Sequence, residues 1–492
     1  MVRLGERVGS AGPVLRCGAI VVAAVVAVGA VVFWLAGWPL GLDCAVYRAG
    51  ALAVLHGSPL YGTLPFLPSW ATGMPFTYPP LAALVFVPLA WLPPQLFWGV
   101  LAVASVLAIA LVLTKAIGPI PLPRLVVVAV GAGSLALEPV WRGIGFGQID
   151  AVLMAAVVLD VLVLPESRWR GVLIGLAAAI KLTPLVFVLH LFLIGRRADA
   201  VRALGAFAGL TVLSLLVLPA DSIRYWSTQV LGGPLFSANP VTNSAQVADQ
   251  SLNGLLERVS GRAGWAFPVA IVLGLVLLAV IVPVVRRLAG RGAQWEALLV
   301  TAGFGLLVSP VSWTHHWVWV VALFGLVVGR YWWLAGVWVV FTGWFQLVVP
   351  HGDGAESQWG IGESIVGNAY VLAALIVILA RSAVLRYEIP TFGRSRFVRN
   401  SRDCCRIVSG AGEFHADQQN LTRGSMFGRR AGRRGDRSRA SGAERGRRGR
   451  FGRRRGGVEP AGRDRRGRAE PDGSAVAQGQ RDRRDRIRRL GQ

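Results

Sequence analysis

Long apolar runs alternate with short polar connections over the first 385 residues of the chain. Many of these runs reach about 18–25 residues, enough for a helix to cross the ~30 Å hydrocarbon core of a bilayer. They lie at about 17–37, 95–114, 122–137, 149–164, 171–195, 201–219, 266–285, 295–309, 313–329, 331–349 and 364–384. The pattern predicts an all-α polytopic membrane protein with about ten to twelve transmembrane helices.

Basic residues predict the orientation of these helices. Arg3, Arg7 and Arg16 precede the first run, and no small-residue cleavage site follows it. We therefore interpret this run as an uncleaved span rather than a signal peptide, with a cytoplasmic N-terminus. The connections near 115–124, 168–170, 196–202, 286–291 and 330 are also basic and are predicted to be cytoplasmic.

The run 171–195 has basic connections on both sides, so it should enter the membrane and return on the same side. It contains Lys181 and Pro184, and a proline inside a helix removes a backbone hydrogen bond. We expect two half-helices that meet inside the protein. The loops left for the outer face carry few basic residues and lie at 38–80, 138–148, 220–264, 309–314 and 350–363.

Composition separates a membrane domain, residues 1–385, from a basic C-terminal segment, residues 386–492. The whole chain is 54% apolar and 16% charged, but residues 386–492 hold 30 Arg against 12 acidic residues. Such a segment buries too little apolar area to offset the entropy of ordering, which predicts a disordered cytoplasmic tail. Contact with anionic lipid headgroups is a second interpretation of the tail, and a frame-shifted translation is a third. Nucleic-acid binding is not expected, because no aromatic platform accompanies the arginines.

Asp43 is the first candidate for chemistry, because it follows the first span at the predicted outer interface. A carboxylate there can act as a general base toward a hydroxyl group. The alternative is a helix cap. Tyr47 and Tyr78, the second within an aromatic–proline turn, lie in the same outer loop region. Aromatic faces with polar rims suit sugar rings, so the region is predicted to bind a sugar.

Further candidates are spread along the chain. His315 and His316 are adjacent and could hold a phosphate when protonated, act as structural histidines, or bind a metal. We expect no metal, because no further ligand lies at a recognisable spacing, and the four cysteines show no zinc or disulfide pattern. Arg142, Gln148 and Asp150 mark an outer connection, where Asp150 alternatively caps the next helix.

Lys181 and Asn253 complete the set of candidates. Lys181 is one of two lysines in the chain, and its charge would suit a phosphate inside the protein. The alternative places Lys181 at the cytoplasmic surface. Asn253 lies in the longest outer loop and is predicted to contact sugar hydroxyls.

Six segments in order resemble the polyprenol-phosphate-mannose-dependent α-(1→2)-mannosyltransferases of glycosyltransferase family 87. The resemblance covers roughly residues 17–385, and each motif is weak alone while the set is specific. The segments are Asp43-Cys44-Ala45-Val46-Tyr47 with Gly57-Ser58-Pro59-Leu60-Tyr61, then Phe76-Thr77-Tyr78-Pro79-Pro80, Phe146-Gly147-Gln148-Ile149-Asp150, Lys181-Leu182-Thr183-Pro184, Asp249-Gln250-Ser251-Leu252-Asn253-Gly254 and Ser309-Pro310-Val311-Ser312-Trp313-Thr314-His315-His316-Trp317.

The resemblance implies a GT-C fold and a multi-pass plasma-membrane enzyme with its active site on the outer face. It implies a polyprenyl-phosphate mannose donor and a mannan-type acceptor such as lipomannan, lipoarabinomannan or a phosphatidylinositol mannoside. The acid of the first outer loop, Asp43, is then the general base. A β-linked phosphosugar that gives an α-glycoside must invert, and the leaving phosphate needs positive or hydrogen-bonding groups.

Candidates for the phosphate are His316 first, then His315, Lys181 and Arg142. Gln148, Tyr47, Tyr78 and Asn253 are candidates for reading sugar hydroxyls. No cofactor is expected, and membrane lipids are the other predicted partners. A related GT-C arabinosyltransferase, a lipid-linked sugar transporter or flippase, and a non-catalytic membrane scaffold remain as alternatives. Transporters usually carry internal repeats, and none is evident in this sequence.

Overall fold

A computed structural model describes residues 8–164, 166–230, 245–261 and 263–387. The disordered tail predicted for 386–492 lies outside these residues, apart from its first two positions. The described chain is helical, with one two-stranded antiparallel sheet that pairs β1 (Val8–Gly9) with β2 (Leu122–Pro123). This confirms the predicted all-α class.

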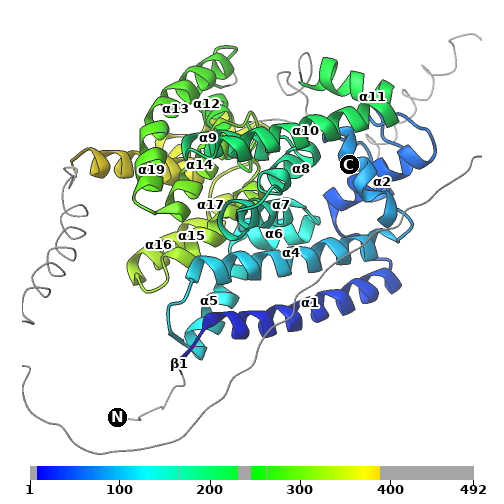
Figure 1. The fold of residues 1–492 in the computed structure, drawn as a ribbon. Coiled ribbons are helices and arrows are strands. Elements are labelled where there is room, and N and C mark those ends of the chain that lie inside the picture. The colour runs from blue at the N-terminus through cyan, green and yellow to red at the C-terminus, as the bar shows by residue number, and fades with distance from the viewer. Residues whose placement is uncertain (1–7, 165, 231–244, 262, 388–492) are drawn as a thin grey trace, which may run out of the picture. The chain divides into compact units, whose positions relative to one another are not determined.

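Nineteen α-helices follow one another along the described residues, and Figure 1 labels most of them. They are α1 (Ala11–Leu35), α2 (Leu42–Leu55), α3 (Pro80–Phe86), α4 (Pro94–Ile117), α5 (Arg124–Leu135), α6 (Glu138–Phe146), α7 (Asp150–Val158), α8 (Val172–Ile180), α9 (Val186–Leu193), α10 (Arg197–Val217), α11 (Pro219–Arg224), α12 (Leu252–Ser260), α13 (Ala266–Gly290), α14 (Gln294–Val308), α15 (Val320–Leu326), α16 (Tyr331–Phe341), α17 (Phe345–Val348), α18 (Ile361–Gly367) and α19 (Ala369–Tyr387).

Short 3-10 and π segments join several of these helices. The 3-10 segments are η1 (Ser69–Ala71), η2 (Val87–Leu89), η4 (Thr183–Leu185), η7 (Thr314–Trp319) and η8 (Ala355–Gln358), and the π segments are η3 (Leu159–Val163) and η5 (Tyr225–Val230).

Four helices in the described residues are long and apolar enough to cross a membrane: α1, α4, α10 and α13. Two bent pairs raise this number to six if each is one span: α5 with α6 at 59°, and α18 with α19 at 75°. The number is lower than the ten to twelve crossings expected from sequence, because several apolar runs are divided into short helices. The run 313–329, for example, becomes η7 and α15.

The outward faces of the long helices are apolar, as lipid contact requires. On α1, Val21, Val25 and Val28 are exposed, while small residues such as Ala23 and Ala30 are buried. This buried side of α1 packs along α4, and the two helices lie side by side in Figure 1. The chain is therefore built as a multi-pass membrane protein, with polar groups concentrated inside.

The break predicted inside the run 171–195 is present. Helix α8 ends at Ile180, Lys181 is extended at φ −146°, and α9 begins at Val186 after η4. Pro184 within η4 and the extended backbone at Lys181 explain why one continuous helix does not form. The break turns Lys181 toward the side chains described next.

Candidate active site

Asp43 lies in the first turn of α2, just after the connection that follows α1. Residue Gly41 caps this helix at φ 76°, and no side chain caps it. The cap interpretation of Asp43 is therefore wrong. Instead, the carboxylate Oδ2 accepts a hydrogen bond from Gln148 Nε2 at 2.6 Å. The first turn of α2 thus presents Asp43 to the segment between α6 and α7.

Tyr47 fixes the direction of the Gln148 amide. The buried Tyr47 hydroxyl donates to Gln148 Oε1 at 2.7 Å and lies 2.9 Å from the Tyr78 hydroxyl. Because the amide oxygen accepts from Tyr47, the amide nitrogen faces Asp43 and donates to it. These hydrogen bonds orient the carboxylate, and direct contact of Tyr47, Tyr78 or Gln148 with a sugar stays a prediction.

The environment of Asp43 raises the pKa of its carboxyl group from 3.8 to about 6. Desolvation by burial is the largest cause, and the repulsion by Asp150 adds to it. The Gln148 hydrogen bond and the Lys181 ammonium act in the opposite direction. The carboxylate is therefore ionised at neutral pH and is still basic enough to accept a proton.

Lys181 is buried beside Asp150 rather than at the cytoplasmic surface. Its Nζ atom donates to Asp150 Oδ1 at 2.7 Å and lies 5.6 Å from the centre of the Tyr78 ring. Only 7% of the Lys181 residue is exposed, so the surface interpretation is wrong. Asp150 is the first residue of α7, yet its side chain pairs with Lys181 and makes no capping bond.

The histidine pair lies in η7, on the other side of Asp150. The His316 Nε2 atom is 4.0 Å from Asp150 Oδ2, and the two imidazole rings are edge-on at 4.6 Å. Burial lowers the pKa of both imidazoles well below 6.5, and nearby positive charge acts in the same direction. The histidines are therefore neutral at pH 7, which disfavours the expected phosphate contact through protonated rings.

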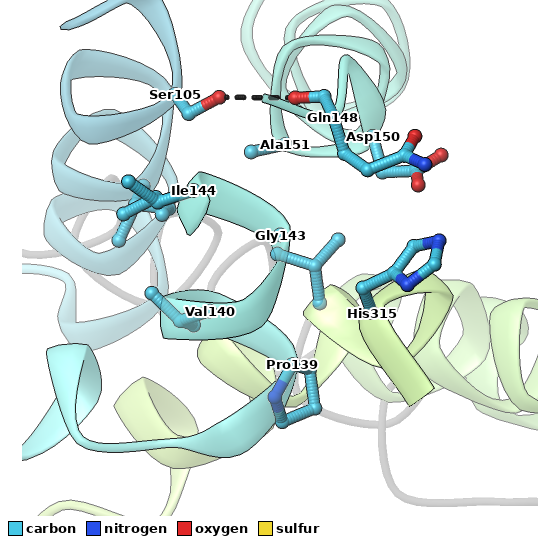
Figure 2. Close-up of a pocket in the computed structure, with 11 residues that line it drawn as sticks. Ser105, Pro139, Val140, Gly143, Ile144, Gln148, Asp150, Ala151 and His315 are labelled. Carbon is cyan, nitrogen blue, oxygen red and sulfur yellow. Dashed lines mark hydrogen bonds between the residues drawn. The ribbon is translucent and has the colours of Figure 1, made fainter. Parts of the chain in front are cut away.

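Figure 2 shows Gln148, Asp150 and His315 pointing toward one another at the edge of a pocket. This pocket has a cavity volume of about 10 Å³ and is otherwise lined mainly by apolar side chains from α4, α6 and α7. A second pocket, with a cavity volume of about 40 Å³, is also lined by Asp150 and in addition by His316. Its walls are mostly aliphatic and aromatic, including Met154, Phe187 and Trp319. The polar side chains of Gln148, Asp150 and the two histidines therefore lie beside pockets that are otherwise mostly apolar.

Arg142 is held by a residue that the sequence reasoning missed. The buried Glu138 carboxyl group forms an ion pair with Arg142, whose Nε atom lies 2.6 Å from Oε1, and it accepts a hydrogen bond from Thr314 Oγ1 at 2.6 Å. It also accepts from Gln346 and Tyr370, so it joins α6 to η7, α17 and α19. An acid at the end of an apolar run, four residues before an arginine, is the sequence feature that could have revealed it.

The loop that precedes α12 supports η7 instead of joining the Asp43 cluster. Asp249 Oδ1 accepts from the backbone N–H groups of Ser251 and Ser312, and Asp249 pairs with Trp313 in a β-bridge. The Asn253 amide donates to Glu257 and to the Pro310 carbonyl oxygen. The structure therefore groups Asn253 with this support, and its contact with sugar stays a prediction.

Comparisons with known proteins agree with the geometry. The model of Glycosyltransferase family 87 matches residues 76–310. The chain is similar to a polyprenol-phosphate-mannose-dependent alpha-(1-2)-phosphatidylinositol mannoside mannosyltransferase of Mycobacterium tuberculosis, with 34% identity over 72% of this chain and 87% of the relative. The protein of the same name from Mycolicibacterium smegmatis is 33% identical over 71% of this chain and 86% of its own length.

A third relative, from Mycobacterium tuberculosis strain CDC 1551, is named as the corresponding phosphatidylinositol pentamannoside mannosyltransferase. It is 31% identical over 76% of this chain and 89% of its own length. No solved structure gives a significant match. The similarity to these relatives extends over most of both chains, and this chain therefore belongs to glycosyltransferase family 87.

Proposed function

We propose that this membrane glycosyltransferase is an inverting α-(1→2)-mannosyltransferase that uses polyprenyl-phosphate mannose. Its acceptor is a mannan-type lipid at the outer face of the plasma membrane, a phosphatidylinositol mannoside or a lipomannan or lipoarabinomannan chain. The names of the relatives support the donor and the phosphatidylinositol mannoside class of acceptor. The contacts of Asp43 and Lys181 support separate roles for the two residues, one as the base and the other near the phosphate.

Asp43 acts as the general base. Its carboxylate accepts the proton of the acceptor hydroxyl while the acceptor oxygen forms a bond to C1 of mannose. The bond between C1 and the phosphate oxygen breaks at the opposite face of the sugar, and the electron pair leaves with the phosphate. The observation that carries the proposal is the Asp43 carboxylate, which has a pKa near 6 and is oriented by Gln148 beside Lys181 and Asp150.

The leaving phosphate lies toward Lys181 and the histidine pair. Lys181 supplies positive charge, and the imidazoles of His315 and His316 supply polar contacts that need no net charge. Arg142 contributes less directly, because its Nε atom already pairs with Glu138. The apolar side chains around the pocket beside Asp150 and His316 suit contact with the isoprene chain of the carrier lipid, which would otherwise contact water.

A membrane assay with radiolabelled polyprenyl-phosphate mannose and a short α-mannoside acceptor tests the proposal. We expect labelled product with the wild-type chain and a loss of about 10²–10⁴-fold with Asp43→Asn, because the amide cannot accept the proton. Glu166→Gln is the control, since Glu166 is almost fully exposed. Transfer from a nucleotide sugar without the lipid carrier, or from a polyprenyl-phosphate arabinose in preference to mannose, would contradict the proposal.

A further inference from the structure

Asp150, His315 and His316 form a cluster of three metal-ligating side chains drawn from distant parts of the chain. Each can offer one ligand atom, and these atoms all lie within 4.8 Å of one another. Ligand atoms around a zinc ion lie roughly 3–4 Å apart, so small side-chain rotations are enough to close the site. The sequence alone did not reveal the third ligand, because Asp150 lies at the start of α7, more than 160 residues before the two histidines.

Buried polar atoms without partners point to a missing ligand. Among the described residues, Asp150 Oδ2, His315 Nε2 and His316 Nδ1 have no hydrogen-bond partner. His315 is 5% exposed, and its ring points toward Asp150 in Figure 2. A buried polar atom that makes no hydrogen bond destabilises the fold, commonly by about 1–3 kcal/mol, unless something binds to it.

Lys181 orients the Asp150 carboxylate so that its second oxygen can bind a metal cation. Its ammonium holds Asp150 Oδ1, which leaves Oδ2 directed toward the His316 imidazole. A side chain that holds one oxygen of a ligating carboxylate fixes its orientation, as partners behind metal ligands commonly do. One carboxylate can therefore serve the lysine and a metal ion at the same time.

The charges around the site also favour a dication. Among the described residues, the carboxyl groups of Asp43 and Asp150 lie near one ammonium group, that of Lys181, while Arg142 pairs with Glu138. The described side chains around Gln148 therefore offer two carboxyl groups and one ammonium group. The donor brings an anionic phosphate into this setting, and its departure adds further negative charge. A bound cation would add to the positive charge of Lys181 and stabilise the leaving phosphate further.

We propose that Asp150, His315 and His316 bind one divalent transition-metal cation of the zinc type, with a free coordination position for a phosphate oxygen. Two imidazoles and one carboxylate are the donor set of open, catalytic zinc sites. The proposal rests on the proposed function for the identity of the phosphate. It replaces direct contact between the imidazoles and the phosphate with contact through the cation. The metal site itself stands on the geometry of the three side chains.

Metal binding by the purified full-length chain in detergent micelles tests the proposal without any activity measurement. After treatment with a chelator, equilibrium dialysis against Zn²⁺ should give one tightly bound ion per chain. Co²⁺ should give the visible absorption bands of a nitrogen- and oxygen-ligated site. Asp150→Asn and His316→Gln should each weaken Zn²⁺ binding at least about 10-fold. His351→Gln is the matched control, because His351 is exposed.

Three results separate the metal site from the proposed function. Wild-type chain that binds no Zn²⁺ and gives no Co²⁺ bands overturns the metal site, as does binding that Asp150→Asn and His316→Gln leave unchanged. If either variant fails to fold, the wild-type Co²⁺ spectrum still decides. Asp43→Asn should bind Zn²⁺ as the wild type does while losing transfer. Asp43-dependent transfer that persists in excess chelator would overturn only the metal site.

Discussion

Opposing interactions raise and lower the pKa of the Asp43 carboxyl group. Burial disfavours the ionised carboxylate, while the Gln148 hydrogen bond and the Lys181 charge favour it. The outcome is a pKa of about 6, above that of an unfolded aspartate and below neutral pH. A general base is most useful when its pKa lies near the working pH, because it is then both ionised and basic.

The pH dependence of the transfer rate on the acidic side, the acid limb of the profile, should follow the ionisation of Asp43. Transfer by the wild-type chain should rise with pH through about 6, since only the ionised Asp43 accepts a proton. Gln148→Leu removes a hydrogen bond that stabilises the ionised form. This should move the limb upward by about one pH unit, because hydrogen bonds to charged groups contribute roughly 1.5–3 kcal/mol.

The measurement is kcat/KM against pH with the same radiolabelled donor. Gln294→Leu serves as the control, because the Gln294 amide donates to the Ala289 carbonyl oxygen, in the connection between α13 and α14. A Gln148→Leu profile with its limb at the wild-type position would show that Asp43 is not the titrating base.

The same carboxyl group links pH to stability in a defined direction. Its folded pKa of about 6 exceeds the value of 3.8 for an exposed aspartate, so the folded chain binds more protons between these two values. Asp43 therefore stabilises the fold less as pH rises through this window. Asp43→Asn removes this term, and its free energy of unfolding should depend less steeply on pH between about 4 and 6.

Single residues were the easiest part of the site to predict. Asp43, Lys181 and the histidine pair are unusual in an apolar chain, and their chemistry marks them without any knowledge of neighbours. Their partners were harder to predict. Asp150 and Glu138 each begin a helix, a position where an acidic residue is common, so the sequence does not mark them as site residues. Only the folded chain brings Asp150 to Lys181 and His316, and Glu138 to Thr314.

At the scale of elements, the close approach of two helix ends positions Asp43, the proposed base: the first turn of α2 lies against the end of α6. Gly147 ends α6 at φ 71°, and a Cβ atom there would lie 2.7 Å from the Cβ atom of Cys44. Cys44 and Gln148 directly follow Asp43 and Gly147 in the chain, so this contact brings the hydrogen-bonded pair together. Glycine is required because a side chain would be both strained and too close.

Gly147→Ala should therefore separate Gln148 from Asp43. We expect transfer to fall about 100-fold, since a displacement of about 1 Å in a catalytic group can cost this much. Gly145→Ala is the control within α6, because open space surrounds the position of its Cβ atom. Equal losses in both variants would mean that α6 itself, and not the contact at Gly147, governs the rate.

Support for η7 rests on Asp249, whose burial raises the pKa of its carboxyl group to about 7. A single carboxylate oxygen accepts the backbone N–H groups of Ser251 and Ser312. Asp249→Ala should lower the free energy of unfolding by about 2–3 kcal/mol, because two buried donors lose their acceptor. Asp249→Asn should keep most of the stability, since its amide oxygen accepts the same bonds.

Thermal unfolding of the purified variants, followed by tryptophan fluorescence, checks this expectation. Similar loss in Asp249→Ala and Asp249→Asn would show that the charge of Asp249, rather than its acceptor oxygen, supports η7.

Sequence reasoning predicted elements best where local chemistry determines them. The break at Lys181–Pro184 follows from proline geometry and appears as predicted. The division of 313–329 into η7 and α15 was not predicted, because its apolar residues suit one helix, whereas tertiary contacts such as those of Asp249 and Glu138 hold η7 apart. Tertiary hydrogen bonds that compete with helix formation leave no periodic pattern in a sequence.

At the scale of the whole molecule, the basic connections predict which side of the membrane each loop faces. Thr72 lies in the predicted outer loop 38–80, and Glu166 lies in a predicted cytoplasmic connection; both are exposed. Single substitutions Thr72→Cys and Glu166→Cys therefore distinguish the two sides. This orientation would place Asp43 with the donor and acceptor outside the cell.

A membrane-impermeant maleimide applied to intact cells should label Thr72→Cys above the wild-type background. Glu166→Cys should be labelled only after the membrane is permeabilised. The wild-type chain, with its own cysteines, is the baseline. The reverse pattern would place the Asp43 side of the molecule in the cytoplasm and would remove the basis for an extracellular acceptor.

The cluster around Asp150 draws on α2, α7, the break between α8 and α9, and η7, which together reach from residue 43 to residue 316. A nascent chain emerging from the ribosome therefore carries the base long before the imidazoles have been translated. Under the proposed mechanism, any product of premature termination before residue 314 would lack the imidazoles and could not transfer mannose. Coexpressing two fragments divided between α10 and α12 would recover transfer only if the separately inserted halves find each other in the bilayer.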